Sequence, residues 1–224
     1  MKKETKKTLR YFLKDDIRLK TDFSRTDQNL GVPAPPIEKP CADNAQLFDL
    51  PSPEDVQELG QMTLQQAIVH RHSRRKFGKT PLSLKELSFL LWATQGVRKK
   101  KYDIALRTVP SAGNRHALET YLAVQKVSGL EPGVYRYLPS RHQLVLESTP
   151  EDLDEKLTDA ALQQPFAGNS AVTFIWTTIP YRMEWRYEEA SYKVIALDAG
   201  HACQNLYLTC ESIHAGTCAI AAYH

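Results

Sequence analysis

Hydrophobic residues beyond residue 60 recur at helical spacing in three stretches of the chain. Thr63 begins a capping-box pattern, and a leucine, an alanine and an isoleucine then share one helical face. Ser83 and Glu86 repeat the capping box before a stripe of leucines, and Gly96 offers a stop. Residues 192–213 carry the longest apolar stripe at this spacing. The pattern therefore predicts three helices, of which the last is the longest.

Shorter apolar runs between these helices predict strands. Residues 118–127 and 171–179 are typical of strands that are buried on both faces. Residues 134–138 and 143–147 flank a polar turn and predict a hairpin. Pro150 predicts the start of another helix, because proline is tolerated at the first helical position. Helices and strands are mixed without strict alternation, which predicts an α+β fold.

The first 60 residues differ in composition from residues 61–224, and we interpret residues 1–60 as an extended N-terminal arm before the main domain. The arm is polar and then rich in proline between Val32 and Pro40, a density that favours extended chain. Such a segment suits a ligand for a proline-binding module. It also suits an arm laid across the domain or a partner subunit and anchored by apolar residues such as Phe12, and this interpretation is preferred.

Composition and charge narrow the classes of function. The chain has 224 residues, of which 42% are hydrophobic and 25% are charged, as in ordinary soluble globular proteins. The net charge of +3 is too small to argue for nucleic acid, and basic runs such as residues 98–101 are typical of solvated faces. No apolar run is long enough for a membrane span, and no signal peptide is evident. We therefore expect a cytoplasmic protein without nucleic-acid or membrane partners.

Cysteine and histidine spacing gives no metal-binding pattern. The four cysteines contain no CxxC pair, so free thiols in a reducing compartment are the simplest interpretation. His70 and His72 lack an evident third ligand. No metal site is therefore predicted.

A first polar segment, Arg71-His72-Ser73-Arg74-Arg75-Lys76-Phe77, carries candidate chemistry. Arg71, Ser73 and Arg75 alternate, and in extended chain their side chains would point to one side. Two guanidinium groups and a hydroxyl that face one anion suit a phosphate group. A basic surface turn after a helix fits the same pattern, so this segment alone leaves both interpretations open.

A second segment, Thr108 to His116, follows before an apolar strand. Its small residues Ser111, Ala112 and Gly113 allow the backbone to approach a planar ligand closely. Asn114 offers both a donor and an acceptor to the polar edge of a heterocycle. An ordinary turn before a strand is the alternative, but the two segments together favour a flat, phosphorylated cofactor.

This combination resembles the nitroreductase-like flavoprotein family, and within it the branch that contains the SagB-type azoline-oxidising dehydrogenases. The resemblance runs from about Leu9 to the end of the chain, and the order and spacing of its pieces make it specific. The pieces that carry it are Arg71–Phe77, Leu84–Gly96, Arg107–Thr120, Gly133–Tyr137, Asp198–His201, Gln204–Leu206 and Gly216–Ile220.

The resemblance implies an α+β fold with a central, mostly antiparallel sheet flanked by helices. It also implies an intertwined homodimer that holds FMN at the subunit interface. The chain has no Rossmann motif, so NAD(P)H would act as a diffusible reductant. The implied FMN contacts are Arg71, His72, Ser73 and Arg75, then Pro110, Ser111, Ala112 and Asn114 from the neighbouring subunit, and Ala219, Ile220 and Ala221 against the isoalloxazine.

Further residues are candidates for the substrate pocket and for catalysis. Tyr135, Tyr137 and Arg186 are candidate pocket residues, and Tyr187 is the candidate catalytic residue. In azoline-oxidising members the place of Arg186-Tyr187 resembles a Lys-Tyr pair that is suited to removing a proton. Arginine is always protonated and cannot act as a base, which leaves anion recognition as a role for Arg186 and proton donation or relay for Tyr187.

This sequence departs from the pattern of the family at one other place. Family members usually continue beyond the Ala-Ile segment at Ala219 with another helix or strand that carries further basic contacts. We therefore expect either a chain shortened after His224 or a subfamily that lacks this element.

The leading hypothesis is an FMN-dependent oxidoreductase that transfers hydride between NAD(P)H or an organic substrate and an acceptor through flavin N5. A first alternative is a non-catalytic flavin-binding protein, or a partner subunit in a modification pathway. A second alternative is an adaptor that uses the proline-rich arm and the basic run 98–101.

Overall fold

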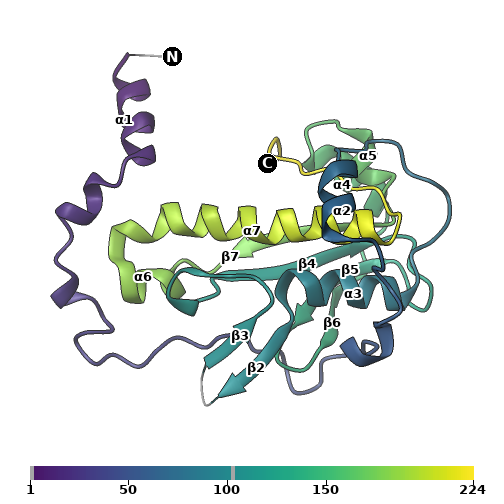
Figure 1. The fold of residues 1–224 in the computed structure, drawn as a ribbon, viewed down its shortest axis with the longest axis horizontal. Helices are drawn as coiled ribbons and strands as arrows, with labels where there is room; N and C mark the ends of the chain where they lie inside the picture. Colours follow the sequence, from purple (N-terminus) through teal and green to yellow (C-terminus); the bar gives the residue numbers. More distant parts are fainter. Residues whose placement is uncertain (1–2, 102–103) are drawn as a thin grey trace.

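The computed structural model describes residues 3–101 and 104–224, and a five-stranded sheet with helices on one face forms its centre (Figure 1). The sheet order is β1-β6-β5-β4-β7, and every neighbouring pair is antiparallel. The strands are β1 (Leu47–Asp49), β2 (Val97–Lys101), β3 (Ile104–Arg107), β4 (Leu118–Val124), β5 (Gly133–Leu138), β6 (Gln143–Ser148) and β7 (Val172–Thr178). The predicted α+β fold with an antiparallel sheet is confirmed.

Seven α-helices and five short 3₁₀ helices are present in the described part of the chain. The α-helices are α1 (Lys3–Leu13), α2 (Leu64–His70), α3 (Leu84–Gln95), α4 (Leu153–Ala160), α5 (Pro165–Gly168), α6 (Tyr181–Tyr187) and α7 (Ser191–Ser212). The 3₁₀ helices are Asp16–Leu19, Phe23–Arg25, Pro53–Val56, Ala112–Asn114 and Glu188–Ala190. The longest helix, α7, crosses the molecule above the sheet (Figure 1).

Local capping signals fix where α2 and α3 begin and end. Thr63 and Ser83 each accept a hydrogen bond from the backbone N–H three residues later, and Gln66 and Glu86 accept the cap N–H in return. Gly96 directly follows α3, and its N–H donates to the Trp92 carbonyl. These predicted helices are confirmed, as is the long helix predicted for residues 192–213.

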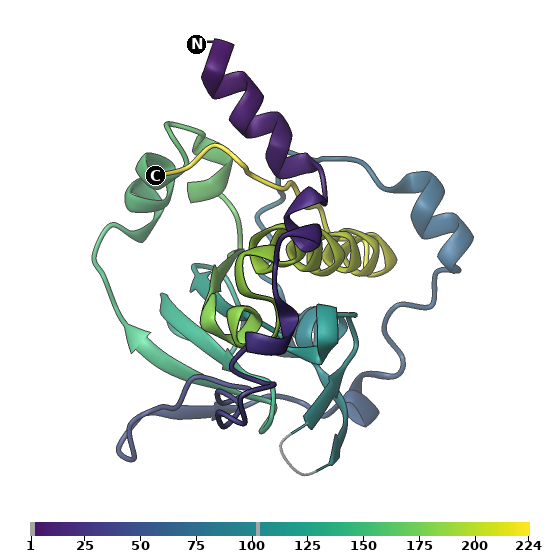
Figure 2. The ribbon, with the colours of Figure 1, turned by 90° about the vertical axis from the view of Figure 1, so that its left-hand side faces the viewer.

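One face of the sheet is apolar and forms the core together with α3 and α7. Leu87 and Leu91 of α3 belong to the same buried cluster as Leu122 of β4. Leu90 of α3 packs with Leu206 of α7 in a second cluster. Burying each such side chain contributes roughly 1.5–3 kcal/mol relative to exposing it. This packing holds α7 in a fixed position relative to the sheet (Figure 2).

The opposite face of the sheet carries polar groups and is covered by the N-terminal arm (Figure 2). Lys39 donates its backbone N–H to Glu119 over 3.0 Å and its Nζ to the Tyr121 hydroxyl over 3.0 Å. Arg136 donates to the carbonyls of Lys39 and Pro40 over 2.7 and 3.1 Å. The proline-rich segment therefore lies against its own domain, and arginine side chains satisfy its backbone carbonyls.

Glu119 is the centre of a buried charge network on this side. Its Oε1 lies 2.6 Å from Arg182 Nη2, and its Oε2 lies 3.8 Å from Arg136 Nη1. The side chains of these three residues are only 2–3% exposed. Arg182 also donates Nη1 to the carbonyl of His116 over 3.2 Å. Burial, reinforced by the positive charge of Arg107, lowers the pKa of His116 to about 3, so this imidazole is neutral at physiological pH.

The structure corrects two predictions about the elements. Residues 3–13 of the arm form a helix, so the arm is not extended throughout. Helix α4 begins at Leu153 and not at Pro150, because Asp152 adopts the left-handed conformation with φ of 52° and interrupts the helical path.

The basic run that begins at Arg98 forms β2 of a separate hairpin with β3. No helix in residues 3–101 and 104–224 combines the length and hydropathy that a membrane crossing requires.

We expect Glu119→Gln to lower the free energy of unfolding by about 3–5 kcal/mol, because Arg182 and Arg136 would stay buried without their shared carboxylate. Chemical denaturation followed by circular dichroism measures this loss. The matched control is Glu58→Gln, in an exposed pair with Lys85 at 2.9 Å, which should leave the transition midpoint unchanged. Equal losses in the two variants would contradict the central role of Glu119.

Stability should also fall as the pH decreases below about 6.5, because unfolded His116 takes up a proton that the buried imidazole refuses until about pH 3. His116→Asn removes this contribution. The slope of unfolding free energy against pH between about 6 and 4 should therefore become shallower by up to roughly 1.4 kcal/mol per pH unit. Denaturant titrations at several pH values measure both slopes, and identical slopes would show that His116 does not titrate as described.

Candidate functional site

The first predicted segment directly follows α2 and contacts α7. Arg71 caps the end of α2, and its guanidinium lies 5.2 Å from the centre of the Tyr207 ring. Ser73 Oγ lies 2.9 Å from the Tyr207 hydroxyl. Arg75 reaches in another direction, 5.8 Å from the ring centre of Phe166 on α5. The arginine between them, Arg74, forms two hydrogen bonds with Glu211 and is thereby neutralised.

His72 is the fourth predicted contact in this segment. Its Nδ1 donates to the carbonyl of His70 over 2.8 Å, which fixes the ring at the surface beside the end of α2. Arg71 is half-buried, whereas His72, Ser73 and Arg75 are exposed. The segment thus presents two cations and a hydroxyl at the surface, close to the second half of α7.

Tyr207 connects this first segment to the C-terminal segment. The backbone N–H of Ala219 donates to the Tyr207 hydroxyl over 2.8 Å, on the same oxygen that meets Ser73. Ile220 is half-buried and Ala221 is exposed beyond it. Gln164, in the turn before α5, donates to the Ala222 carbonyl over 3.2 Å. Two of the three predicted cofactor segments are therefore brought together through Tyr207, which lies 134 residues after Ser73 in the sequence.

The second predicted segment lies against the first half of α7. The N–H of Ala112 donates to Asp198 Oδ1 over 3.3 Å, and Ser111 Oγ accepts the His116 N–H over 2.9 Å. Asn114 Oδ1 lies 2.9 Å from His116 Nε2. Asn114 adopts φ of 57°, which asparagine tolerates better than most residues. Pro110 precedes this turn and is exposed.

Gly113 in this turn touches the pair predicted for catalysis and substrate binding. A methyl group added at Gly113 would lie 2.6 Å from the Tyr187 hydroxyl and 2.7 Å from Arg186 Cδ, closer than real contacts allow. Its φ of 56° also favours glycine. The structure therefore brings Arg186 and Tyr187, at the end of α6, into contact with the second cofactor segment.

The two halves of the predicted site are separated along α7. Asp198 holds the second segment, and Tyr207 holds the first and third. At 1.5 Å per residue, these two positions are roughly 13 Å apart along the helix axis. Within this chain the predicted site therefore consists of two half-sites along α7.

Two predicted pocket residues lie elsewhere. Tyr135 and Tyr137 are 1% and 0% exposed and belong to the buried cluster between the sheet and α3. Tyr135 donates to the Glu131 carbonyl over 2.8 Å, and the Tyr137 hydroxyl lies 2.8 Å from His142 Nδ1. The prediction that they line a substrate pocket is wrong, because β5 turns both side chains toward the core.

The sequence alone assigned no role to Tyr207, Asp198 or Arg115, although Asp198 lies in a piece of the resemblance and Arg115 lies within the second segment. Tyr207 follows directly after a quoted piece of the resemblance, but helical spacing alone marks it only as a position beside the core stripe. Asp198 is 6% exposed, and its Oδ2 has no hydrogen-bond partner among the described residues. Burial raises the pKa of this carboxyl group. A buried, incompletely satisfied carboxylate beside the second segment is typical of a functional site.

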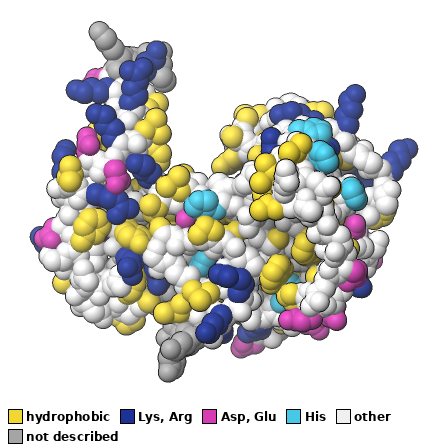
Figure 3. Space-filling view, in the orientation of Figure 1, with side chains coloured by type: hydrophobic (Ala, Val, Ile, Leu, Met, Phe, Trp, Pro, Cys, Tyr) yellow, Lys and Arg dark blue, Asp and Glu magenta, His cyan; other side chains and the backbone are white. Residues whose placement is uncertain are grey.

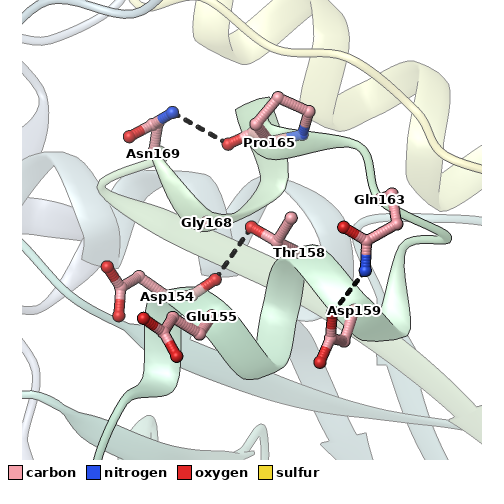
Figure 4. A pocket seen from close by; sticks show the side chains of 8 residues that line it. All are labelled: Asp154, Glu155, Thr158, Asp159, Gln163, Pro165, Gly168 and Asn169. Atoms are coloured by element: carbon pink, nitrogen blue, oxygen red, sulfur yellow. Dashed lines mark hydrogen bonds between the residues drawn. The ribbon is translucent and has the colours of Figure 1, made fainter.

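A surface hollow of about 280 Å³ lies between α4 and α5 (Figure 4). It is lined by carboxylate and amide groups, and several of them are occupied by local hydrogen bonds, such as that from Asn169 to the Pro165 carbonyl. Within the described ranges, no group of three or more His, Cys, Asp or Glu residues is arranged to hold a metal ion. None of the predicted cofactor residues lines this hollow.

Comparison with known proteins identifies the family of this chain. A model described as "Nitroreductase family" matches residues 68–224. A candidate nitroreductase of Methanocaldococcus jannaschii is 33% identical over 167 residues, which cover 75% of this chain and 82% of the relative. The trifolitoxin-processing protein of Rhizobium leguminosarum bv. trifolii is 32% identical over 109 residues, but these cover 47% of this chain and only 29% of that protein.

Solved structures show the same fold. The crystal structure of a candidate nitroreductase from Ralstonia eutropha superposes with a TM-score of 0.61 and 28% identity, and the match covers 80% of each chain. The family match begins at residue 68, later than the expected start of the resemblance near Leu9, so it leaves the arm outside. The matched residues contain all three predicted cofactor segments, and the chain belongs to the nitroreductase family of oxidoreductases.

Proposed function

We propose that this protein is an FMN-dependent oxidoreductase that accepts hydride from NAD(P)H or an organic substrate and passes it to an acceptor. The observation that carries the proposal is the junction at Tyr207, which unites the first and third predicted segments. Arg71 lies over the Tyr207 ring at this junction, Arg75 lies over the Phe166 ring of α5, and within the described residues neither forms an ion pair with a carboxylate. Two uncompensated guanidinium groups beside a hydroxyl suit a phosphate group.

The residues present fit a flavin mononucleotide. Arg71, Ser73 and Arg75 would hold its phosphate and ribityl chain, and His72 would border it. The backbone from Ala219 to Ala221 would lie beside the isoalloxazine, where amide N–H groups stabilise developing negative charge. When bound, FMN supplies a ring that takes up and releases hydride at N5.

The second segment would complete this site from a partner subunit. The turn that contains Pro110, Ser111, Ala112 and Asn114 is bonded to Asp198, roughly 13 Å along the α7 axis from the Tyr207 junction of the same chain. Figure 3 shows a saddle above α7 with hydrophobic side chains along the arm. The helices α1, α2 and α7 carry exposed apolar residues, which include Leu9 and Phe12 of α1, Ile68 of α2 and Leu197 of α7. A second copy seated on this surface would form the proposed homodimer with FMN at its interface.

Tyr187 and Arg186 would then act on the substrate at the partner's flavin. The Tyr187 hydroxyl can donate or relay a proton, and Arg186 can bind an anion but cannot take up a proton. Gly113 fixes both side chains against the second segment, so they would enter the site together with it.

A place in a modification pathway is the second candidate function. In such a pathway the chain would have a role similar to that of SagB-type dehydrogenases. Alternatively, it would be a partner subunit that binds flavin but does not turn over a substrate. The observation that favours it is the 32% identity to the trifolitoxin-processing protein. Replacement of the family's lysine by Arg186 argues against azoline oxidation by the same proton-removing pair.

The purified protein should be yellow, with the absorption bands of oxidised flavin, and anaerobic NADH or NADPH should bleach it. The cofactor released by heat should be FMN by chromatography. Bleaching with turnover of an acceptor supports the enzyme, whereas tight FMN that neither nucleotide reduces supports the non-catalytic alternative. A colourless protein that fails to bind added FMN would overturn the proposal.

Tyr207→Phe should weaken FMN binding about tenfold, because two hydrogen bonds of about 0.5–1.5 kcal/mol each no longer hold the first and third segments together. Fluorescence quenching of FMN titrated into apoprotein measures the dissociation constant. The matched control, Tyr11→Phe, removes a hydroxyl from α1 that makes no described hydrogen bond and should leave the affinity unchanged. Unchanged affinity in Tyr207→Phe would contradict the role of the junction.

A further inference from the structure

A second cationic site lies beside Gly113, apart from the arginines assigned to the cofactor phosphate. Arg186 lies 5.6 Å from the ring centre of Tyr187, and Arg18 of the arm lies at the same distance from that ring. Arg115 lies 4.6 Å from the ring centre of Trp185, one residue before Arg186. Guanidinium groups and aromatic rings from the arm, the second segment and α6 therefore meet at one place.

Two of these cations lack a counter-charge. Among residues 3–101 and 104–224, no carboxylate lies within 4.0 Å of the guanidinium of Arg115 or Arg186. Arg115 donates Nε to the Arg182 carbonyl over 3.1 Å, which leaves its terminal nitrogens available. Burial and the nearby positive charge of Arg186 lower the pKa of Arg115. Arg18, by contrast, is paired with Asp15 at 3.0 Å.

The buried and half-buried arginines that do form ion pairs show what this site lacks. Arg74 is paired with Glu211, Arg136 with Glu147, and Arg182 with Glu119. Placing two half-buried guanidinium groups together without a carboxylate is unfavourable in the free protein. The repulsion is relieved when an anion binds between them, and the planar fork of arginine suits a carboxylate in particular.

We propose that Arg186 and Arg115 form a binding site for the carboxylate of a planar organic substrate. The half-buried ring of Tyr187 supplies apolar surface beside the cations, so the site suits an aromatic carboxylate. The inference rests on the proposed function, because it places this substrate beside the second cofactor segment. It goes further by assigning Arg115 a role and by naming the chemical class that the protein selects.

The test compares 4-nitrobenzoate with 4-nitrobenzamide, two nitroaromatic acceptors of nearly equal size that differ in charge. Their dissociation constants are measured with the oxidised holoenzyme from the change in flavin absorption, and their KM and kcat values are measured with NADPH or NADH. We expect the parent protein to bind the benzoate at least tenfold more tightly. Arg186→Gln and Arg115→Gln should each reduce this preference to less than threefold, with little change for the benzamide.

Arg141→Gln is the matched control, because Arg141 is an exposed arginine in the turn between β5 and β6. It should keep the full preference for the benzoate. Thermal melting of each variant shows that it is folded, and Arg186→Lys should retain part of the preference. Equal affinity for both acceptors in the parent, or an unchanged preference in both glutamine variants, would overturn the proposal.

Two further measurements separate this inference from its alternatives. If Arg186 instead stabilised the reduced flavin ring, Arg186→Gln would lower the flavin reduction potential and leave the benzoate preference intact, which would overturn the proposal. Calorimetric titration of sodium benzoate against benzamide tests the arginine pair even in protein without flavin. A yellow, reducible protein without benzoate preference would contradict only this inference, whereas a colourless protein that prefers benzoate would contradict only the flavin proposal.

Discussion

A rigid helix of 22 residues, α7, sets the distance between the two halves of the candidate site. Its buried side, through Leu206, is fixed by packing against α3. Its other contacts hold the functional segments, since Asp198 binds the Ala112 N–H and Tyr207 binds Ser73 and Ala219. Because a helix cannot shorten, these half-sites stay roughly 13 Å apart along the axis. In the proposed dimer, cofactor binding and subunit association are therefore the same event.

The N-terminal arm takes part in this arrangement from the other side of the molecule. Trp185 of α6 accepts the N–H of Gln28 over 2.9 Å and donates its indole N–H to the Val32 carbonyl over 2.9 Å. The next two residues of α6 are Arg186 and Tyr187, which touch Gly113. The arm thus supports the helix end that carries the candidate substrate-binding residues. A proline-rich segment whose carbonyls are occupied by buried arginines is poorly suited to binding a separate proline-recognition module.

Local signals in the sequence predicted local structure well. The capping boxes at Thr63 and Ser83, the stop at Gly96 and the long helix all depend on neighbours within a few residues. Pro150 failed as a helix start because Asp152, two residues later, adopts a left-handed backbone that a continuous helix does not allow.

Predictions about the candidate site also depended on whether the relevant contacts are between near neighbours in the sequence. The resemblance predicted three cofactor segments from their order along the chain, but it did not predict that Tyr207 and Asp198 of α7 would contact them. Tyr135 and Tyr137 were misplaced because alternation along a strand does not reveal which face the helices cover. Tyr207 and Arg115 were missed because their partners are distant in sequence, and an ion pair that is absent leaves no sequence pattern.

The arginine at position 186 also bears on the direction of the proposed reaction. A lysine beside a tyrosine can be deprotonated and then remove a proton from a substrate that is being oxidised. Arg186 stays protonated, so the pair it forms with Tyr187 can donate a proton and bind an anion but cannot serve as such a base. A substrate that receives hydride needs a proton donor and not a proton acceptor. Within the proposed function, the chemistry of this pair therefore favours reduction of an anionic acceptor over oxidation of a neutral substrate.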